Sequence, residues 1–257
     1  MSFLDDIIDI GRSVFGGDGL GAQLARTAAL GGALYLLNNT NKSSSNPSAA
    51  SQPAAPDPRN RITLTPNTEN SIPVIYGSAY APGMLTDAQI SNSNTRMHFV
   101  YTICERTGTK LSDGVASTFQ FNDIYINDQR CVFKTDGITV DYTVDKDSNV
   151  DYSMQNLVRV YCFAGDSTSP VVPVGYTNTS LSNASSIVPT WTTAYNMSNL
   201  VFAVVEVNFS RDKNVTAAPS SVKFHVTNSM TMPGDCIYDY MTNEMYGAGI
   251  PAAEISV

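Results

Sequence analysis

Charge is scarce in this sequence, and positive charge is scarcest of all. Only 15% of the 257 residues are charged, and 15 Lys and Arg stand against 23 Asp and Glu, for a net charge of −8. Nucleic-acid binding needs clustered Lys and Arg to neutralise phosphates, so we predict no nucleic-acid partner. Polarity comes instead from Ser, Thr, Asn and Gly, while apolar residues make up 42% of the chain. This composition is typical of a β-rich structural protein with many turns.

Residues that bind metals or carry redox chemistry are also few. The chain has two histidines, His98 and His225, and each alternates with apolar residues as in an ordinary strand. The four cysteines are too far apart for a C-x-x-C motif. Two histidines and scattered cysteines do not make a zinc site, so no metal or cofactor is predicted. We expect free, mostly buried thiols at Cys104, Cys131, Cys162 and Cys236.

The sequence contains no motif for catalysis. It has no G-x-S-x-G elbow, no Walker pattern and no dinucleotide-binding glycine pattern. A Ser-His-Asp triad stays open as an alternative, because triads assemble in space rather than along the chain. Residues 145–151 match the first ligand positions of a calcium loop, but Val150 replaces the required glycine and Asn156 the bidentate glutamate. We therefore predict no catalytic residue and no enzyme, and interpret 145–149 as a hairpin turn.

Long hydrophobic runs are absent as well. In residues 20–37, Arg26 interrupts a small, apolar segment and leaves about 11 apolar residues, short of the roughly 20 that a bilayer span requires. We predict no stable membrane span, and interpret 1–38 as a helical docking arm that contacts another protein, with membrane contact as the alternative. The predicted partner interface consists of the apolar side chains of this arm: Leu4, Ile7, Ile8, Phe15, Leu30, Leu34 and Leu37.

Residues 39–60 are rich in Ser, Asn, Ala and Pro and read as a flexible linker. From residue 61 to residue 257 the apolar period becomes two, which predicts a β-rich domain. Its expected strands include a short β run at 72–77, a strand at 97–104 with one face more buried, and a central strand at 200–209. A parity switch at Asn122 and Asp123 predicts a turn or bulge, and symmetric apolar positions around 145–149 predict a hairpin.

Residues 235–246 have the pattern of one short amphipathic helix. Asp235 is the expected N-cap, because its carboxylate can accept first-turn amides. Spacings of three and four place Ile237, Tyr240 and Met241 on one face, which we expect to be buried. Gly247 or Gly249 should end the helix.

Three blocks of the sequence together resemble a known family. The first is IPVIYG at 72–77 with PGMLTD at 82–87, and the second runs from YTICE at 101–105 to DIYIND at 123–128. The third begins near Trp191, passes through 199–207, and ends in the helix at 235–251. They are similar to the tail-tip or baseplate hub proteins of tailed phages, relatives of the tip attachment (host-specificity) protein of lambda-like phages. The matching residues of the family motif are Tyr76, Gly77, Asp239, Thr242, Asn243, Tyr246, Gly247, Gly249 and Pro251.

The resemblance implies a fold and an assembly. The expected fold is mainly β: an antiparallel β-barrel or β-sandwich body with a short C-terminal helix, preceded by one or two N-terminal helices on a flexible linker, with an inserted β subdomain at about 140–198. In hubs of this family such domains pack as a trimeric ring that adapts the sixfold tail tube to a threefold tip. Family members usually continue beyond the helix, so the receptor-binding part and host recognition are not carried over.

The expected function is therefore that of a structural component of a phage tail tip or baseplate. It would act as a hub-like or adaptor module, bind other tail and baseplate subunits, form a homo-oligomer (a trimer in the central hub), and reside in the virion after synthesis in the host cytoplasm. One alternative is a carbohydrate-binding or fibre-attachment module, because a Tyr-rich, Asn- and Ser-rich surface suits such contacts. A weaker alternative is a cell-wall or capsule hydrolase.

Overall fold

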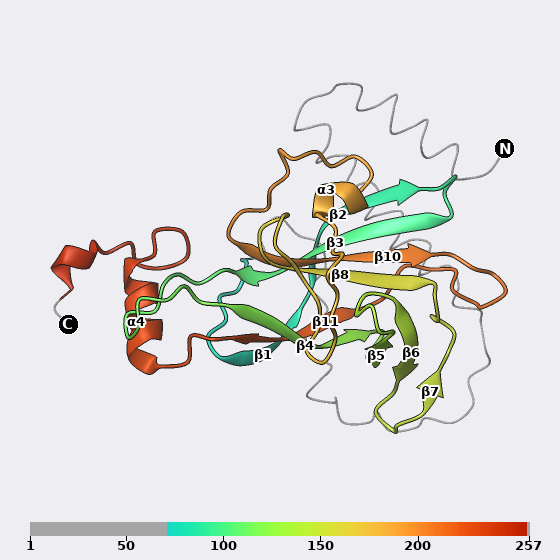
Figure 1. The fold of residues 1–257 in the computed structure, drawn as a ribbon, viewed down its shortest axis with the longest axis horizontal. Helices are drawn as coiled ribbons and strands as arrows, with labels where there is room; N and C mark the ends of the chain where they lie inside the picture. Colours follow the sequence, from blue (N-terminus) through green and yellow to red (C-terminus); the bar gives the residue numbers. More distant parts are fainter. Residues whose placement is uncertain (1–70, 256–257) are drawn as a thin grey trace, which may run out of the picture. The chain divides into compact units, whose positions relative to one another are not determined.

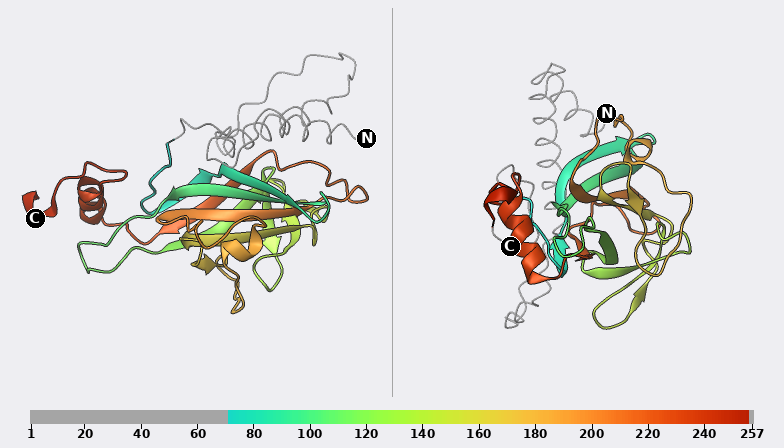
Figure 2. Two further views of the ribbon diagram at one scale, coloured as in Figure 1. Left: turned by 90° about the horizontal axis from the view of Figure 1, so that it is seen from above. Right: turned by 60° about the vertical axis from the view of Figure 1, so that its left-hand side comes forward.

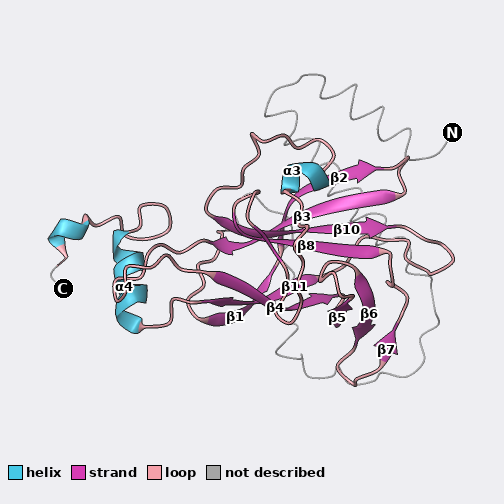
Figure 3. Cartoon of the chain, viewed as in Figure 1, coloured by secondary structure: helices cyan, strands magenta, loops and turns pink. Residues whose placement is uncertain are grey.

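The structure is a computed structural model that describes residues 71–255 (Figure 1). The predicted docking arm, the linker and the partner-interface residues from Leu4 to Leu37 lie outside the described residues. The described part is mainly β, as predicted, and its strands form two antiparallel sheets (Figure 3). Within residues 71–255 neither sheet closes into a barrel, so the sandwich is the correct form of the prediction.

The central strand of the five-stranded sheet is β10, which the continuous apolar run at 200–207 predicts. The sheet has the order β2 (Met84–Ser91), β3 (Arg96–Glu105), β10 (Leu200–Asn208), β8 (Val158–Gly165) and β9 (Pro170–Val171). The prediction of one more buried face for 97–104 is wrong, because every residue from Met97 to Cys104 is buried. Both faces of this sheet are covered, and alternation in sequence reports burial only where one face meets water.

The six-stranded sheet contains the predicted bulge and the predicted hairpin. Its order is β1 (Ser78–Pro82), β11 (Val222–Asn228), β4 (Phe119–Ile126), β5 (Gln129–Phe133), β6 (Val140–Val144) and β7 (Val150–Asp151). His225 pairs with Asp123 and Val226 with Phe121, so the extra residue Asn122 forms the bulge that lets both halves of β4 bury their apolar side chains. Val144 pairs with Val150 across the hairpin turn.

Figure 2 shows the two sheets packed against each other, and aromatic side chains fill the space between them. The ring of Tyr101 in β3 lies 6.5 Å from that of Phe224 in β11, and Phe121 lies edge-on to Phe224 at 6.2 Å. The opposite face of the five-stranded sheet is covered by residues 184–191, which include α3 (Ala184–Ile187). There Trp191 packs near Phe202 and donates from Nε1 to Asp87 Oδ2 at 2.8 Å.

The segments 72–77 and 140–198 differ from a regular strand and from a separate subdomain. The short β run at 72–77 is reduced to a single bridge between Val74 and Glu105, and β1 begins only at Ser78. Pro73 has no N–H to donate, and Gly77 adopts φ +71° and turns the chain, which explains the loss of regular pairing. The segment 140–198, expected as an inserted subdomain, supplies β6 and β7 to one sheet and β8 and β9 to the other.

The cysteine prediction is confirmed. All four cysteines are free; Cys104, Cys131 and Cys162 are buried, and Cys236 is half-buried. Burial raises the pKa of the Cys104 and Cys131 thiols to about 12, so both are protonated at neutral pH.

Among residues 71–255, no helix is long and apolar enough to cross a membrane.

A cluster of charged side chains lies within the five-stranded sheet. The Glu206 carboxylate is almost fully buried, with Arg159 Nη1 at 3.5 Å and Arg96 Nε at 3.6 Å from its Oε1. His98, only 3% exposed, lies beside it with Nδ1 3.8 Å from Glu206 Oε2, and its Nε2 is 2.9 Å from Ser91 Oγ. Of the two ring nitrogens of His98, Nε2 therefore has a hydrogen-bond partner, whereas the buried Nδ1 has none.

We expect acid to destabilise the fold through His98. Burial, opposed in part by the Glu206 carboxylate, lowers the pKa of His98 below its ordinary value of 6.5. The folded state therefore favours the neutral ring, and this contribution is complete above pH 6.5 and is lost as pH falls through the lower folded-state pKa. The free energy of unfolding in urea should decrease from about pH 7.5 to about pH 5, and the decrease should be shallower in His98→Gln.

The slope with pH is the relevant readout, because His98→Gln also removes a buried contact with Ser91. Glu206 contacts His98, and Arg96 and Arg159 contact Glu206. All three of these charged residues remain in the variant. An unchanged slope in His98→Gln would show the assignment to be wrong, as would a slope that is flattened by His225→Gln instead.

Candidate functional site

The C-terminal helix α4 (Pro233–Thr242) begins earlier than the sequence predicts. Met232 is its N-cap and Pro233 occupies its first turn, where the missing N–H of proline costs no hydrogen bond. Asp235 is not the N-cap. Its carboxylate instead accepts from the backbone N–H of Ser112 at 2.8 Å and from the Ser112 hydroxyl at 2.7 Å. The side chain expected to cap the helix therefore attaches it to the loop after β3.

The predicted buried face of this helix is also wrong. Ile237 and Tyr240 are 60% and 52% exposed, whereas Asp235 and Asp239 are 3% and 4% exposed. The surface beneath the helix presents N–H and O–H donors, and apolar side chains there would leave these donors without acceptors. The carboxylates consequently take the inner face, and the apolar side chains turn outward.

Asp239 is the centre of the contact. Its Oδ2 accepts hydrogen bonds from the hydroxyls of Tyr76 at 2.8 Å and Tyr246 at 2.7 Å, and its Oδ1 accepts from the backbone N–H of Gly108 at 2.8 Å. Burial, and then the hydrogen bond to the Asp239 carboxylate, raise the pKa of both tyrosines above its usual range. A Cβ on Gly108 would lie 2.7 Å from Asp239 Oδ1, so only glycine allows this approach.

The turn after α4 is held by Asn243 and two glycines. Asn243 Oδ1 accepts from the N–H groups of Met245 at 2.8 Å and Tyr246 at 3.2 Å, which turns the Tyr246 hydroxyl back toward Asp239. A Cβ on Gly247 would lie 1.9 Å from the Tyr240 carbonyl oxygen. Gly249 adopts φ +64° and donates its N–H to the Asn243 carbonyl at 3.0 Å. The helix ends at Thr242 with Asn243 as its C-cap, earlier than the predicted Gly247 or Gly249, and the two glycines instead allow the close backbone packing of the turn that follows.

Most residues of the family motif therefore meet in one place. Gly77 joins the same region, because its N–H donates to the Met230 carbonyl at 3.0 Å, just before α4. Two residues stay outside the network: Thr242 donates to the Tyr238 carbonyl at 2.9 Å within the helix, and Pro251 is exposed and precedes the short η2 (Ala252–Glu254). The other seven residues that resemble the motif thus take part in anchoring the helix and the turn after it.

Sequence reasoning missed the buried polar residues that complete the anchor. Asn228, fully buried, donates from Nδ2 to the Ile75 carbonyl at 2.7 Å and to Thr107 Oγ1 at 2.8 Å. Thr107 in turn donates to Ser117 Oγ at 2.7 Å. In a chain rich in Asn, Ser and Thr, nothing in the local pattern distinguishes these three from surface residues.

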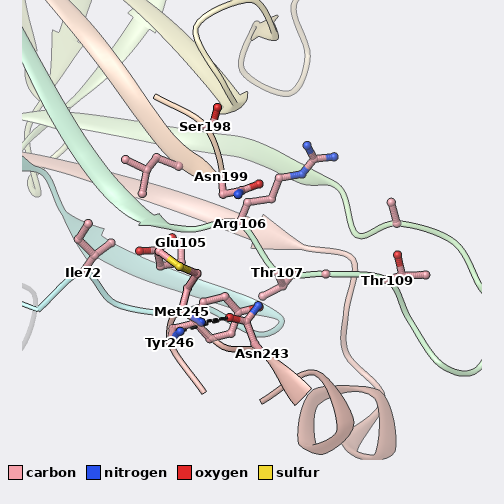
Figure 4. Close-up of a pocket in the computed structure, with 13 residues that line it drawn as sticks. Ile72, Glu105, Arg106, Thr107, Thr109, Ser198, Asn199, Asn243, Met245 and Tyr246 are labelled. Carbon is pink, nitrogen blue, oxygen red and sulfur yellow. Dashed lines mark hydrogen bonds between the residues drawn. The ribbon is translucent and has the colours of Figure 1, made fainter. Parts of the chain in front are cut away.

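A cavity of about 440 Å³ lies beside the anchor (Figure 4). It is bounded by the end of β3, the start of β10 and the turn after α4, and burial raises the pKa of the Glu105 carboxyl in its wall. Its lining includes Ile72, Glu105, Arg106, Asn199, Asn243, Met245 and Tyr246. This mixture of one acid, one base, amides, hydroxyl groups and apolar side chains suits a polypeptide or small polar group.

Two Ser-His-carboxylate arrangements occur within the described residues. Ser78 Oγ lies 3.0 Å from His225 Nε2, and Asp123 Oδ2 lies 3.4 Å from His225 Nδ1, so this set has the hydrogen-bond order of a catalytic triad. The second set, Ser91, His98 and Glu206, is incomplete. The Ser91 to His98 distance of 2.9 Å suits a hydrogen bond, but His98 Nδ1 lies 3.8 Å from Glu206, beyond hydrogen-bond reach. Asp145, from the calcium-like sequence, accepts from the N–H groups of Asp147 and Asn149 at 2.8 Å each and so closes the hairpin turn. Within the described residues no group of three metal-ligating side chains comes together.

Comparison with known proteins adds no relative: no family model matches the chain, and no curated protein matches it.

Asp239→Asn should loosen the helix anchor. An amide oxygen can replace one carboxylate oxygen, but the amide nitrogen would face a donor, so the free energy of unfolding should decrease by roughly 2–4 kcal/mol. Chemical denaturation provides the measurement. Glu244→Gln, an exposed carboxylate in the turn after the same helix, serves as the matched control. Equal effects of the two substitutions would contradict a special role for Asp239.

Gly247→Ala should open the turn after α4. The added Cβ would overlap the Tyr240 carbonyl oxygen, and a rigid backbone atom cannot move aside as a side chain can. We expect a loss of about 2 kcal/mol or more in the free energy of unfolding and faster proteolysis after residue 243. Gly234→Ala is the control, because nothing lies within 4 Å of its added Cβ. Similar proteolysis of both variants would contradict the packing argument.

Proposed function

We propose that this protein is a structural component of a phage tail tip or baseplate. In this role it is a hub-like or adaptor module that assembles with tail-tube and baseplate subunits and connects them to fibres or to the tip. The observation that carries the proposal is the anchored helix α4. The residues that resemble the hub-family motif converge on Asp239, and the helix they fix presents its apolar side chains outward.

The outward side of this helix has the chemistry of a protein interface. We define the α4 surface by three exposed side chains: Met232 at 61%, Ile237 at 60% and Tyr240 at 52%. Exposed patches of apolar side chains mark interaction sites in soluble proteins, and Met and Tyr are both enriched in interfaces. The hydrogen bonds of Asp235 and Asp239 hold the helix in place before any partner arrives, which limits the entropy lost on binding.

The sheet edges support an assembly role as well. Strand β2 has eight residues and, within the described residues, pairs only with β3. The edge strands β7 and β9 have two residues each and offer little backbone for pairing. A long free edge is a site for strand addition from another subunit unless it is protected. In the proposed ring, α4 and β2 are the two places at which neighbouring subunits pack.

Incorporation into particles tests this proposal. Ile237→Ser combined with Tyr240→Ser removes apolar contact area without touching the Asp239 anchor, so the purified protein should fold normally by circular dichroism but be missing from assembled tails. Complementation of phage that lack the native copy, followed by mass spectrometry of purified particles, provides the measurement. Val174→Ser, at a side chain 55% exposed and outside α4, is the matched control and should be incorporated.

A density map of the particle provides the second test. The central hub places the subunits in a closed ring around the tail axis, and the adaptor places them at the periphery of the baseplate. Absence of the protein from purified tails, or normal incorporation of the doubly substituted protein, would overturn the proposed function.

A further inference from the structure

The two sheets differ in how their outer faces are covered. Residues 184–191 cover the outer face of the five-stranded sheet. On the six-stranded sheet, Ala81, Phe224 and Ile124 point inward and are buried. Their neighbours along the strands point to the opposite side, where Tyr80, Val150 and Tyr152 are the large exposed side chains.

One end of this outer face carries a preorganised aromatic group. Tyr80 in β1 pairs with His225 in β11, and their rings stack at 4.3 Å with 13° between planes. The His225 ring is fixed by Ser78 Oγ at 3.0 Å from Nε2 and by Asp123 Oδ2 at 3.4 Å from Nδ1. Tyr125 packs edge-on to Tyr80 at 6.0 Å. We name Tyr80, Tyr125 and His225 the tyrosine platform.

The Tyr80 ring remains open to a ligand. It is 63% exposed, and the stack with His225 covers only the face toward β11. Within the described residues β1 pairs with β11 alone and is the edge of the sheet. The opposite ring face therefore lies on the side of that edge. Because its neighbours fix the ring, little side-chain entropy remains to be lost when a ligand stacks on it.

The charged groups around the platform occur in pairs of opposite sign. Asp123 lies 3.7 Å from Arg130 and also contacts His225, and Lys223 contacts Asp128. Such pairs offer donors and acceptors without a net charge that would select an ionic ligand. The cores of protein interfaces are depleted in charged residues, and the α4 surface fits that description better than the platform does.

We propose that the tyrosine platform binds a neutral saccharide. One face of a pyranose ring consists of C–H groups that pack on an aromatic ring, here the open face of Tyr80. Hydroxyl groups of the further units that cross the outer face toward β4 and β5 can exchange hydrogen bonds with the hydroxyl of Tyr125, the carboxylate of Asp123 and the guanidinium of Arg130. An exposed tyrosine beside paired polar groups supplies both kinds of contact. This inference is independent of the proposed role in the tail.

A second pair of tyrosines predicts the length of the ligand. Tyr142 and Tyr152 lie 5.7 Å apart, and Tyr152 is 56% exposed. Tyr142 in β6 pairs with Val132 in β5, two residues from Arg130, so it shares the outer face with the platform. Strand β1, which carries Tyr80, and strand β6 are four positions apart in the sheet, roughly 19 Å. An oligosaccharide can reach both the tyrosine platform and the pair of Tyr142 and Tyr152, whereas a monosaccharide can contact only one of these two groups.

Binding to saccharides of defined charge and length tests the proposal. The full-length protein is applied to an array of neutral, anionic and aminated oligosaccharides, and the strongest neutral hit is measured by isothermal titration calorimetry together with its monosaccharide. We expect neutral oligosaccharides to bind, the monosaccharide to bind more weakly, and Tyr80→Ala to lower the affinity by about tenfold. Tyr152→Ala should weaken binding of the oligosaccharide and leave that of the monosaccharide unchanged.

Tyr195→Ala is the matched control, because Tyr195 is 43% exposed and stacks on Trp191, away from the six-stranded sheet. It should bind like the unmodified protein. The proposal is overturned if no neutral oligosaccharide binds, if only charged ones bind, or if Tyr80→Ala and Tyr195→Ala bind equally well. Cross-linking of residue 80 to a neighbouring protein in assembled particles would likewise overturn it. Purified protein suffices for the binding assays, so their failure leaves the assembly proposal standing.

Discussion

The buried carboxylate of Asp239 must be matched by donors, and the arrangement of the C-terminal region follows from that requirement. Its three donors come from distant segments: Tyr76 before β1, Gly108 after β3 and Tyr246 after α4. Hydrogen bonds to a charged group contribute about 2 kcal/mol each, so this group outweighs the burial of a few apolar side chains on a ten-residue helix. Because the polar side of α4 faces the segments before β1 and after β3, Ile237 and Tyr240 stay exposed on its other side.

Two surfaces with different chemistry result from this fold. The α4 surface combines aliphatic, methionine and tyrosine side chains on a rigid helix, which favours contact with protein. The tyrosine platform lies on the outer face of the six-stranded sheet and combines an open aromatic ring with paired charges, which favours a neutral polyhydroxyl ligand. A subunit that packs through one surface and binds saccharide through the other would join assembly to attachment.

Short-range patterns were sufficient for much of the fold. The parity switch at Asn122 located the bulge, the continuous apolar run located β10 at the centre of a sheet, and the polar loop at 145–149 located the hairpin. The motif residues were identified through resemblance to a family, and the structure brings most of them together. The Asp235 cap and the buried Ile237 face failed as predictions because the surface beneath the helix presents donors, which draw the carboxylates inward. The helix also ends at Thr242, before the glycines that were expected to end it.

The sequence by itself determined the class of fold, the strands with regular alternation and the free thiols. These features depend on residues that are neighbours along the chain or across one turn. Only the tertiary structure decided which side of α4 is buried, which sheet face stays open, and that Asn228, Thr107 and Ser117 share one network. The physical reason is that a buried donor or acceptor is satisfied by any partner within about 3 Å, however distant in sequence, and local periodicity carries no information about that partner.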